Sequence, residues 1–173
     1  MRLVAVFVAG LAAWLGTTAV MAADKAVLLA GVGQYDIIPN DKKSVAFHAQ
    51  YRFAGGFGGG KVLGGKFLGL KPLIGGFINA DKGGLVFAGF AAPLQWGNGL
   101  FEFEPSAGIA AYRRGDSTFL GGTAQFHLGM QGSVRVIRGV RAGLGVTHVS
   151  NAKILHKKNR GTNILMGTVG WEF

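Results

Sequence analysis

Every second residue at the C-terminal end of the chain is apolar or glycine, and the series ends in an aromatic side chain. These residues are Leu165, Gly167, Val169, Trp171 and Phe173. Because side chains alternate between the two faces of a β-strand, the five would share one face. An apolar face of this kind is typical of a strand that faces lipid in a transmembrane barrel. The alternative is an ordinary amphipathic strand that happens to end in phenylalanine.

Seven further segments carry strand-like patterns of similar length. They are residues 26–35, 44–53, 66–78, 85–96, 100–113, 125–136 and 140–150. A transmembrane strand needs about ten residues, so eight strands and their connections fit the chain. The pattern predicts an all-β fold, an eight-stranded antiparallel transmembrane β-barrel. The glycine-rich stretch 55–65 stays open as a turn, a distorted strand start or a bulge.

The first 22 residues differ from the rest in composition. Arg2 is followed by an apolar run over residues 3–15 and by small residues up to Ala22. This order predicts a secretory signal peptide, cleaved after Ala22 or Ala23, with residues 23–173 forming the barrel. The alternative is an uncleaved membrane anchor, because residues 3–22 carry no charge.

Composition narrows the setting of the barrel. The chain has 173 residues, no cysteine and 31 glycines, so disulfides are excluded and long helices are disfavoured. Only helices and closed barrels satisfy every backbone hydrogen bond in lipid, which favours a barrel in the bacterial outer membrane. Such barrels have short periplasmic turns and longer extracellular loops. Residues 97–99 and 137–139 would then be periplasmic turns, and the connections 36–42, 113–117 and 151–161 would be extracellular.

The segment 140–150 breaks its own pattern near its end. Alternation places five of its residues on the lipid-facing side, and only the last two are polar: Ala142, Leu144, Val146, His148 and Ser150. A polar pair on a lipid-facing stripe is costly unless it has partners or a task. An imidazole beside a hydroxyl is the pair that nucleophilic catalysis uses. The alternative is that the two residues merely mark the membrane interface, where polar side chains cost little.

The residues around this pair match a known family. Residues 147–152 read Thr-His-Val-Ser-Asn-Ala, which is similar to the His-x-Ser-Asn-Ala motif of the PagL-type lipid A 3-O-deacylases. Residues 159–163 resemble the Asn-x-Gly-x-Glu/Asn element of that family, and weaker similarity runs through 103–112 and 121–136. The resemblance thus covers roughly the C-terminal half of the chain. It implies an eight-stranded outer-membrane barrel with a serine hydrolase site on its lipid-facing surface.

The same resemblance implies roles for individual residues. Ser150 would be the nucleophile, His148 its general base, and Asn151 would bind the oxyanion through its side chain or its backbone N–H. The third catalytic position falls on Asn163, where the best-known members have glutamate. Asparagine can fix the imidazole tautomer but offers no negative charge, so Asn163→Glu is expected to preserve or raise activity. Lys153 stands where the motif more often has glycine.

No carboxylate obviously takes over the third position. Glu102 and Glu104 are expected to point into the barrel near its periplasmic end. Four aspartates are expected on loops, and only a folded-over loop would bring one to the site: Asp36, Asp41, Asp81 and Asp116.

The formal net charge is +10, and several cations follow the serine motif. Lys153, Lys157, Lys158 and Arg160 would either clamp the phosphates of lipid A or form a solvated basic loop. Nucleic acid, the usual partner of a strongly basic chain, is not expected for an exported barrel. No cluster of residues has the spacing of a metal site, so neither a metal nor a cofactor is expected. His48 and His127 are expected to point into the lumen.

These sequence features support two functions from different classes. The first is a lipid A deacylase, a serine esterase that hydrolyses the 3-O-linked hydroxyacyl chain of lipopolysaccharide among the outer-membrane lipids. The second is a non-catalytic barrel that binds lipopolysaccharide or stabilises the membrane. The sequence leaves open whether two copies form a homodimer.

Overall fold

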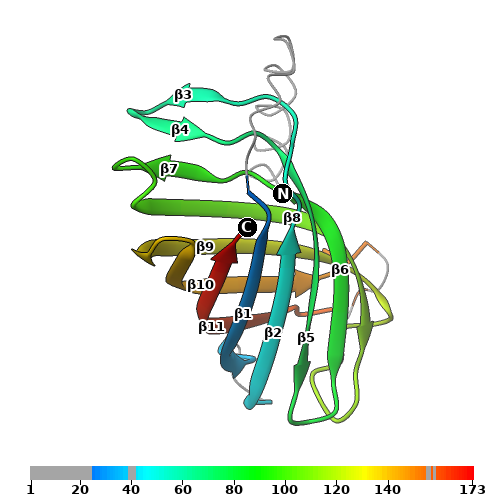
Figure 1. Cartoon of the computed structure of the whole chain (residues 1–173). Coiled ribbons are helices and arrows are strands. Elements are labelled where there is room, and N and C mark those ends of the chain that lie inside the picture. Colours follow the sequence, from blue (N-terminus) through cyan, green and yellow to red (C-terminus); the bar gives the residue numbers. More distant parts are fainter. Residues whose placement is uncertain (1–24, 39–41, 155–156, 158) are drawn as a thin grey trace.

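The computed structural model describes residues 25–38, 42–154, 157 and 159–173 (Figure 1). The predicted signal peptide, residues 1–22, lies outside the described residues. In chain order the strands are β1 (Val27–Tyr35), β2 (Ser44–Arg52), β3 (Gly60–Val62), β4 (Gly65–Phe67), β5 (Lys71–Asn79), β6 (Gly84–Ala91), β7 (Leu94–Trp96), β8 (Phe101–Arg113), β9 (Ala124–Ile137), β10 (Val140–Ser150) and β11 (Thr162–Glu172). Within the described ranges, no helix has the length and apolar character needed to cross a membrane.

Eight of these strands close into a ring. The order around the ring is β1, β2, β5, β6, β8, β9, β10 and β11, and β11 pairs back with β1. Each neighbouring pair is antiparallel. Closure pairs the backbone of every strand with a neighbour, as the interior of a membrane requires. The predicted eight-stranded antiparallel barrel is confirmed. Six strands have limits close to those predicted, whereas the predicted strand 66–78 divides into β4 and β5 and the predicted strand 85–96 divides into β6 and β7.

Three short strands, β3, β4 and β7, extend the wall beyond the ring (Figure 1). Strand β7 continues β6, since both pair with β8 in one register and only Ala92 and Pro93 separate them. Proline has no backbone N–H, so the ladder is interrupted there. The glycine-rich stretch 55–65 includes the turn of the β3–β4 hairpin, and Leu63 takes a positive φ of 50° at that turn.

The two ends of the barrel differ. The end with β3, β4 and β7 also holds both ends of the described chain, where the Ala26 backbone N–H donates to the Phe173 carbonyl at 2.9 Å. We call this the terminal end. The opposite end, which we call the loop end, carries the β1–β2, β8–β9 and β10–β11 connections, residues 36–43, 114–123 and 151–161. At the terminal end the β2–β5 connection, residues 53–70, is longer but includes the β3–β4 hairpin, and the other turns there are short.

Outward and inward side chains differ as the sequence pattern predicts. On β10, Leu144 is 67% exposed and Val146 is 42% exposed, whereas Thr147 and Val149 are buried. Val169 and Trp171 on β11 are also exposed. An outer face of apolar side chains is the surface that a transmembrane barrel presents to lipid.

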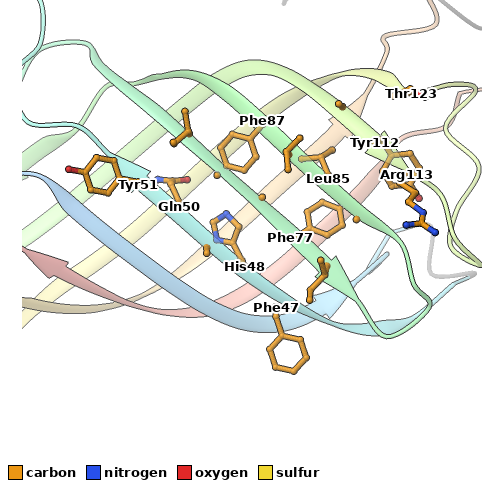
Figure 2. A pocket seen from close by; sticks show the side chains of 18 of the residues that line it. Phe47, His48, Gln50, Tyr51, Phe77, Leu85, Phe87, Tyr112, Arg113 and Thr123 are labelled. Atoms are coloured by element: carbon orange, nitrogen blue, oxygen red, sulfur yellow. The ribbon is translucent and has the colours of Figure 1, made fainter.

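The close view of the wall shows the same alternation on β2. Phe47 points away from the barrel, and His48, the next residue, points into it (Figure 2). His48 stacks on Phe87 with ring centroids 6.0 Å apart, and Phe87 stacks on His127 at 3.8 Å. Both histidines are therefore buried lumen residues, as predicted.

The lumen near the terminal end holds a buried cluster of charges. Arg52 Nη1 lies 3.0 Å from Glu102 Oε1 and also contacts Glu104. Gln50 donates to Glu104 at 2.9 Å, and Gln95 donates to Glu102 at 2.5 Å. Removed from water, these charges depend on each other and on the two amides for their stability. The two glutamates point inward near this end, as predicted.

Arg52→Met is expected to destabilise the barrel by about 3–5 kcal/mol, because it leaves two buried carboxylates without their cation. The measurement is the urea midpoint of folding in phospholipid vesicles. Arg113→Met, which removes an exposed arginine at the loop end, is the control and should leave the midpoint nearly unchanged. Equal midpoints for the two variants would contradict a structural role for the cluster.

Candidate active site

Two neighbouring strands place three polar side chains together on the outer wall at the loop end. His148 and Ser150 lie two residues apart on β10, so both share the outward face of Val146. Asn163, near the start of β11, is directly opposite His148 in the strand register. Each of the three is partly exposed, so a molecule approaching from outside the barrel can reach them.

The three side chains form a continuous hydrogen-bonded series. His148 Nε2 lies 3.0 Å from Ser150 Oγ, and His148 Nδ1 lies 2.8 Å from Asn163 Oδ1. Asn163 Nδ2 donates in turn to the backbone carbonyl of Ile38 at 2.8 Å. The structure therefore brings together the three residues that the sequence singled out for catalysis, and it adds a fourth group to them.

The Ile38 carbonyl determines how the asparagine amide is oriented. A carbonyl oxygen only accepts hydrogen bonds, so Asn163 must turn Nδ2 toward Ile38 and Oδ1 toward the imidazole. Because Oδ1 also only accepts, His148 Nδ1 carries the ring proton. His148 Nε2 then presents a lone pair to the hydroxyl of Ser150 and can take its proton. A hydroxyl beside a base that a third group orients is the arrangement of an activated nucleophile.

Gly161 lies against this pair from the β10–β11 connection. Its φ is +74°, and a Cβ at this position would lie 2.7 Å from His148 Cε1 and 3.3 Å from Ser150 Cβ. The imidazole therefore packs directly against the Gly161 backbone. Asn159 holds this segment by accepting a hydrogen bond from the Gly161 backbone N–H at 2.7 Å. These are the first and third positions of the Asn-x-Gly element, to which the motif alone gave no role.

The turn after Ser150 determines which groups of Asn151, the side chain or the backbone N–H, are free to bind an oxyanion. Its side chain is fully buried, donates to the Leu120 carbonyl at 3.3 Å and accepts from the Lys153 backbone N–H at 3.0 Å. The side chain therefore connects two loops. The oxyanion role that the resemblance implies for Asn151 would therefore fall to its backbone N–H, because the side chain is engaged in these two hydrogen bonds.

Lys153 adopts a backbone conformation that explains the glycine preference of the motif. Its φ is +60°, and that of Ala152 before it is +52°. Glycine adopts this left-handed region with the least strain, so glycine is the residue best suited to the position of Lys153. Strained backbone next to a reactive side chain is a recurring feature of functional sites.

The predicted basic residues fall into different environments. Lys153 and Lys157 are exposed in the connection that follows Ser150. Arg160 is also on the surface, and its Nη2 lies 3.4 Å from Asp36 Oδ2. Lys158 lies outside the described residues. The two exposed lysines are thus the described cations nearest in the chain to Ser150.

One loop carboxylate does reach the neighbourhood of the site. Asp36 folds over from the β1–β2 connection, and its Oδ1 accepts from Thr162 Oγ1 at 3.0 Å. It contacts the residue before Asn163, whereas the described hydrogen bonds of the His148 ring go to Ser150 and Asn163. The Asp81 carbonyl accepts from the backbone N–H of Asp116, and Asp41 lies outside the described residues.

Fold and site together define a transmembrane β-barrel with a serine–histidine–asparagine arrangement on its outer wall. The family model of the lipid A 3-O-deacylase (PagL) matches residues 34–172, and the chain belongs to this family. The predicted resemblance is confirmed and extends well beyond the C-terminal half, to include the β1–β2 connection. No curated protein matches the chain.

Two solved structures share the fold. The crystal structure of the outer membrane enzyme PagL has a TM-score of 0.68 and 14% sequence identity, covering 85% of this chain and 99% of that chain. A de novo designed transmembrane β-barrel has a TM-score of 0.56 and 13% identity, covering 88% of this chain and 98% of that chain. A designed barrel matches the chain at nearly the same identity as the enzyme does. The fold alone therefore does not indicate an activity, which has to be inferred from the side chains of the site.

Proposed function

We propose that the protein is a lipid A deacylase of the bacterial outer membrane, a serine esterase that hydrolyses the 3-O-linked hydroxyacyl chain of lipid A. The observation that carries the proposal is the hydrogen-bonded series Ser150–His148–Asn163 on the lipid-facing wall. Family membership supports the substrate, because lipid A deacylation is the activity for which the family is described.

The position of the site suits a substrate that stays in the membrane. His148 and Ser150 continue the outward face of Leu144 and Val146, at the loop end of the barrel. Longer loops face the outside of the cell in outer-membrane barrels. An ester of lipid A in the outer leaflet can therefore approach Ser150 sideways, with its acyl chain still against the apolar wall.

In the first half of the reaction, Ser150 Oγ attacks the ester carbonyl while its proton passes to His148 Nε2. The carbonyl oxygen gains a negative charge, which the backbone N–H of Asn151 stabilises. The tetrahedral intermediate collapses, the bond to the sugar oxygen breaks, and His148 returns the proton to that oxygen. An acyl group remains as an ester on Ser150.

In the second half, water takes the place of the sugar hydroxyl. His148 Nε2 removes a proton from the water, whose oxygen attacks the acyl carbon. Collapse of this intermediate releases the hydroxy fatty acid, and the proton returns to Ser150 Oγ. Asn163 Oδ1 accepts from His148 Nδ1 throughout, and so keeps Nε2 directed at the reacting oxygen.

The exposed lysines after Ser150 supply the charge to hold lipid A. Lysine ammonium groups bind phosphate as point charges, and lipid A carries phosphate on its sugars. Lys153 and Lys157 project from the connection that also carries Gly161 at the site. We assign them to phosphate binding, together with Arg160.

Lys157→Glu is expected to lower kcat/KM for lipid A by up to about fivefold, mainly through KM, because an exposed ion pair contributes roughly 0.2–1 kcal/mol. Steady-state kinetics on purified lipid A in mixed micelles measures this effect. Lys61→Glu makes the same charge change on an exposed residue of β3, at the terminal end, and is the matched control. Equal losses in both variants would show only a general effect of net charge.

Mass spectrometry of lipid A from cells with and without the protein tests the function as a whole. Loss of one hydroxyacyl chain, dependent on the protein, is the expected result. Identical spectra, with the barrel shown to be folded by its heat-modifiable migration in a gel, would instead favour a non-catalytic barrel.

A further inference from the structure

The β1–β2 connection forms two hydrogen bonds with Asn163. The Ile37 backbone N–H donates to the Asn163 carbonyl at 3.0 Å, and the Asn163 side chain donates to the Ile38 carbonyl at 2.8 Å. Ile38 and Asn163 are 125 positions apart in the sequence. The third member of the proposed catalytic series is thus fixed by a segment from the opposite end of the chain.

Asp36 anchors this segment to β11 and to its own loop. Its carboxylate is fully buried and accepts from Thr162 Oγ1 and from the Lys42 backbone N–H, both at 3.0 Å. Arg160 adds an ion pair at 3.4 Å. A buried carboxylate with this many partners is held firmly, because each bond offsets part of its desolvation. The two residues that follow are therefore held over Asn163.

We propose that Asp36 is a positioning residue for catalysis: it fixes the Ile38 carbonyl, which selects the amide orientation of Asn163 and thereby the tautomer of His148. This inference rests on the proposed function, since it assigns the contacts a role in that reaction. Asp36 acts through Thr162 and the turn that it begins, and it touches neither the imidazole nor the serine.

The same contact explains why an amide serves at position 163. A carboxylate placed there would turn one oxygen toward His148 and the other toward the Ile38 carbonyl. The second carboxylate oxygen and the carbonyl both only accept hydrogen bonds, so they would repel each other. The amide avoids this conflict, because its Nδ2 supplies the donor that Ile38 needs.

Asp36→Asn tests the proposal because it keeps the shape of the side chain but removes its charge and one of its two acceptor oxygens, so the amide cannot accept from Thr162, Lys42 and Arg160 together. Thr162→Val removes a different bond of the same anchor and provides a second variant if the first fails to fold. Asp116→Asn removes one negative charge from another loop and is the matched control, since its side chain is exposed.

Two measurements are made on folded barrels in detergent. The first is the rate at which an uncharged fluorophosphonate labels Ser150, followed by intact mass, which requires no phosphate contact. The second is the ¹⁵N spectrum of the His148 ring, identified by its loss in His148→Gln, which reports the tautomer without any reaction. Asp36→Asn and Thr162→Val are expected to slow labelling by up to about 10²-fold and to mix the two tautomers, while Asp116→Asn does neither.

Asn163→Asp supplies an independent test. It introduces an acid next to His148, yet it is expected to be labelled more slowly than the wild type, because its second oxygen faces the Ile38 carbonyl. Faster labelling of Asn163→Asp would overturn the proposal, as would wild-type rates and an unchanged tautomer in both anchor variants. Failure of the proposed function is a different result: the wild type itself would then show neither labelling at Ser150 nor deacylation of lipid A.

Discussion

Ser150→Ala is expected to abolish the deacylation of lipid A while the barrel still folds and inserts. Removing Oγ removes the attacking atom, so the loss should approach about 10⁶-fold, the scale seen when a serine protease loses its nucleophile. The measurement is release of the hydroxy fatty acid from lipid A, with heat-modifiable migration as the test of folding. His148→Ala should cost about as much, because the hydroxyl then has no base within reach.

The double variant decides whether the two residues act as a unit. If Ser150 and His148 carry out one reaction, the loss in Ser150→Ala/His148→Ala should be close to that of either single variant and far below their product. Near-normal turnover by a folded Ser150→Ala protein would exclude the serine mechanism and leave the barrel fold intact as a finding.

The position of His148 and Ser150 could be predicted because it depends only on alternation along one strand. Once Leu144 and Val146 face lipid, His148 and Ser150, which lie two and four positions after Val146, must face the same way. Asn163 followed from the same rule on β11, since it shares the outward face of Leu165. Register between adjacent hairpin strands then brings Asn163 opposite His148, which is a short-range consequence of the chain order.

The contact with Ile38 could not be predicted in this way. It joins a loop to a strand 125 positions away, and neither its length nor its composition fixes where a loop carbonyl will lie. The omission changes an expectation. From the sequence alone, Asn163→Glu should preserve or raise activity by adding a charge; beside the Ile38 carbonyl, the added carboxylate oxygen is expected to lower it.

The direction of the Asn151 side chain depends on a similar detail. Ala152 and Lys153 adopt left-handed conformations that turn the chain sharply after Ser150. With the chain turned in this way, the Asn151 side-chain amide donates a hydrogen bond to the Leu120 carbonyl in another loop. A motif places a residue in the chain, but the bend that follows it decides which of its groups can meet the substrate.

Gly161→Ala is expected to lower the rate of deacylation by about 10²-fold, although position 161 contributes no reacting atom. The new methyl group would lie 2.7 Å from His148 Cε1 and 3.2 Å from Nε2, too close for either atom to stay in place. The Asn163 contact resists movement of Nδ1, so the ring must rotate and carry Nε2 away from Ser150 Oγ. A misplacement of about 1 Å at a reacting group can cost this much in rate.

Gly139→Ala is the matched control for this prediction. Gly139 has a φ of +79°, close to the +74° of Gly161, so alanine meets a similar backbone strain at both positions. At Gly139, however, the nearest atom to a Cβ is the Glu172 carbonyl oxygen at 3.4 Å, and the turn lies at the terminal end. Both variants should therefore lose similar stability in urea, and only Gly161→Ala should lose activity. Equal activities in the two folded variants would show that the position of the imidazole does not depend on the absence of a side chain at residue 161. A loss of activity in Gly161→Ala alone would show that the glycine of the Asn-x-Gly element is needed to place His148.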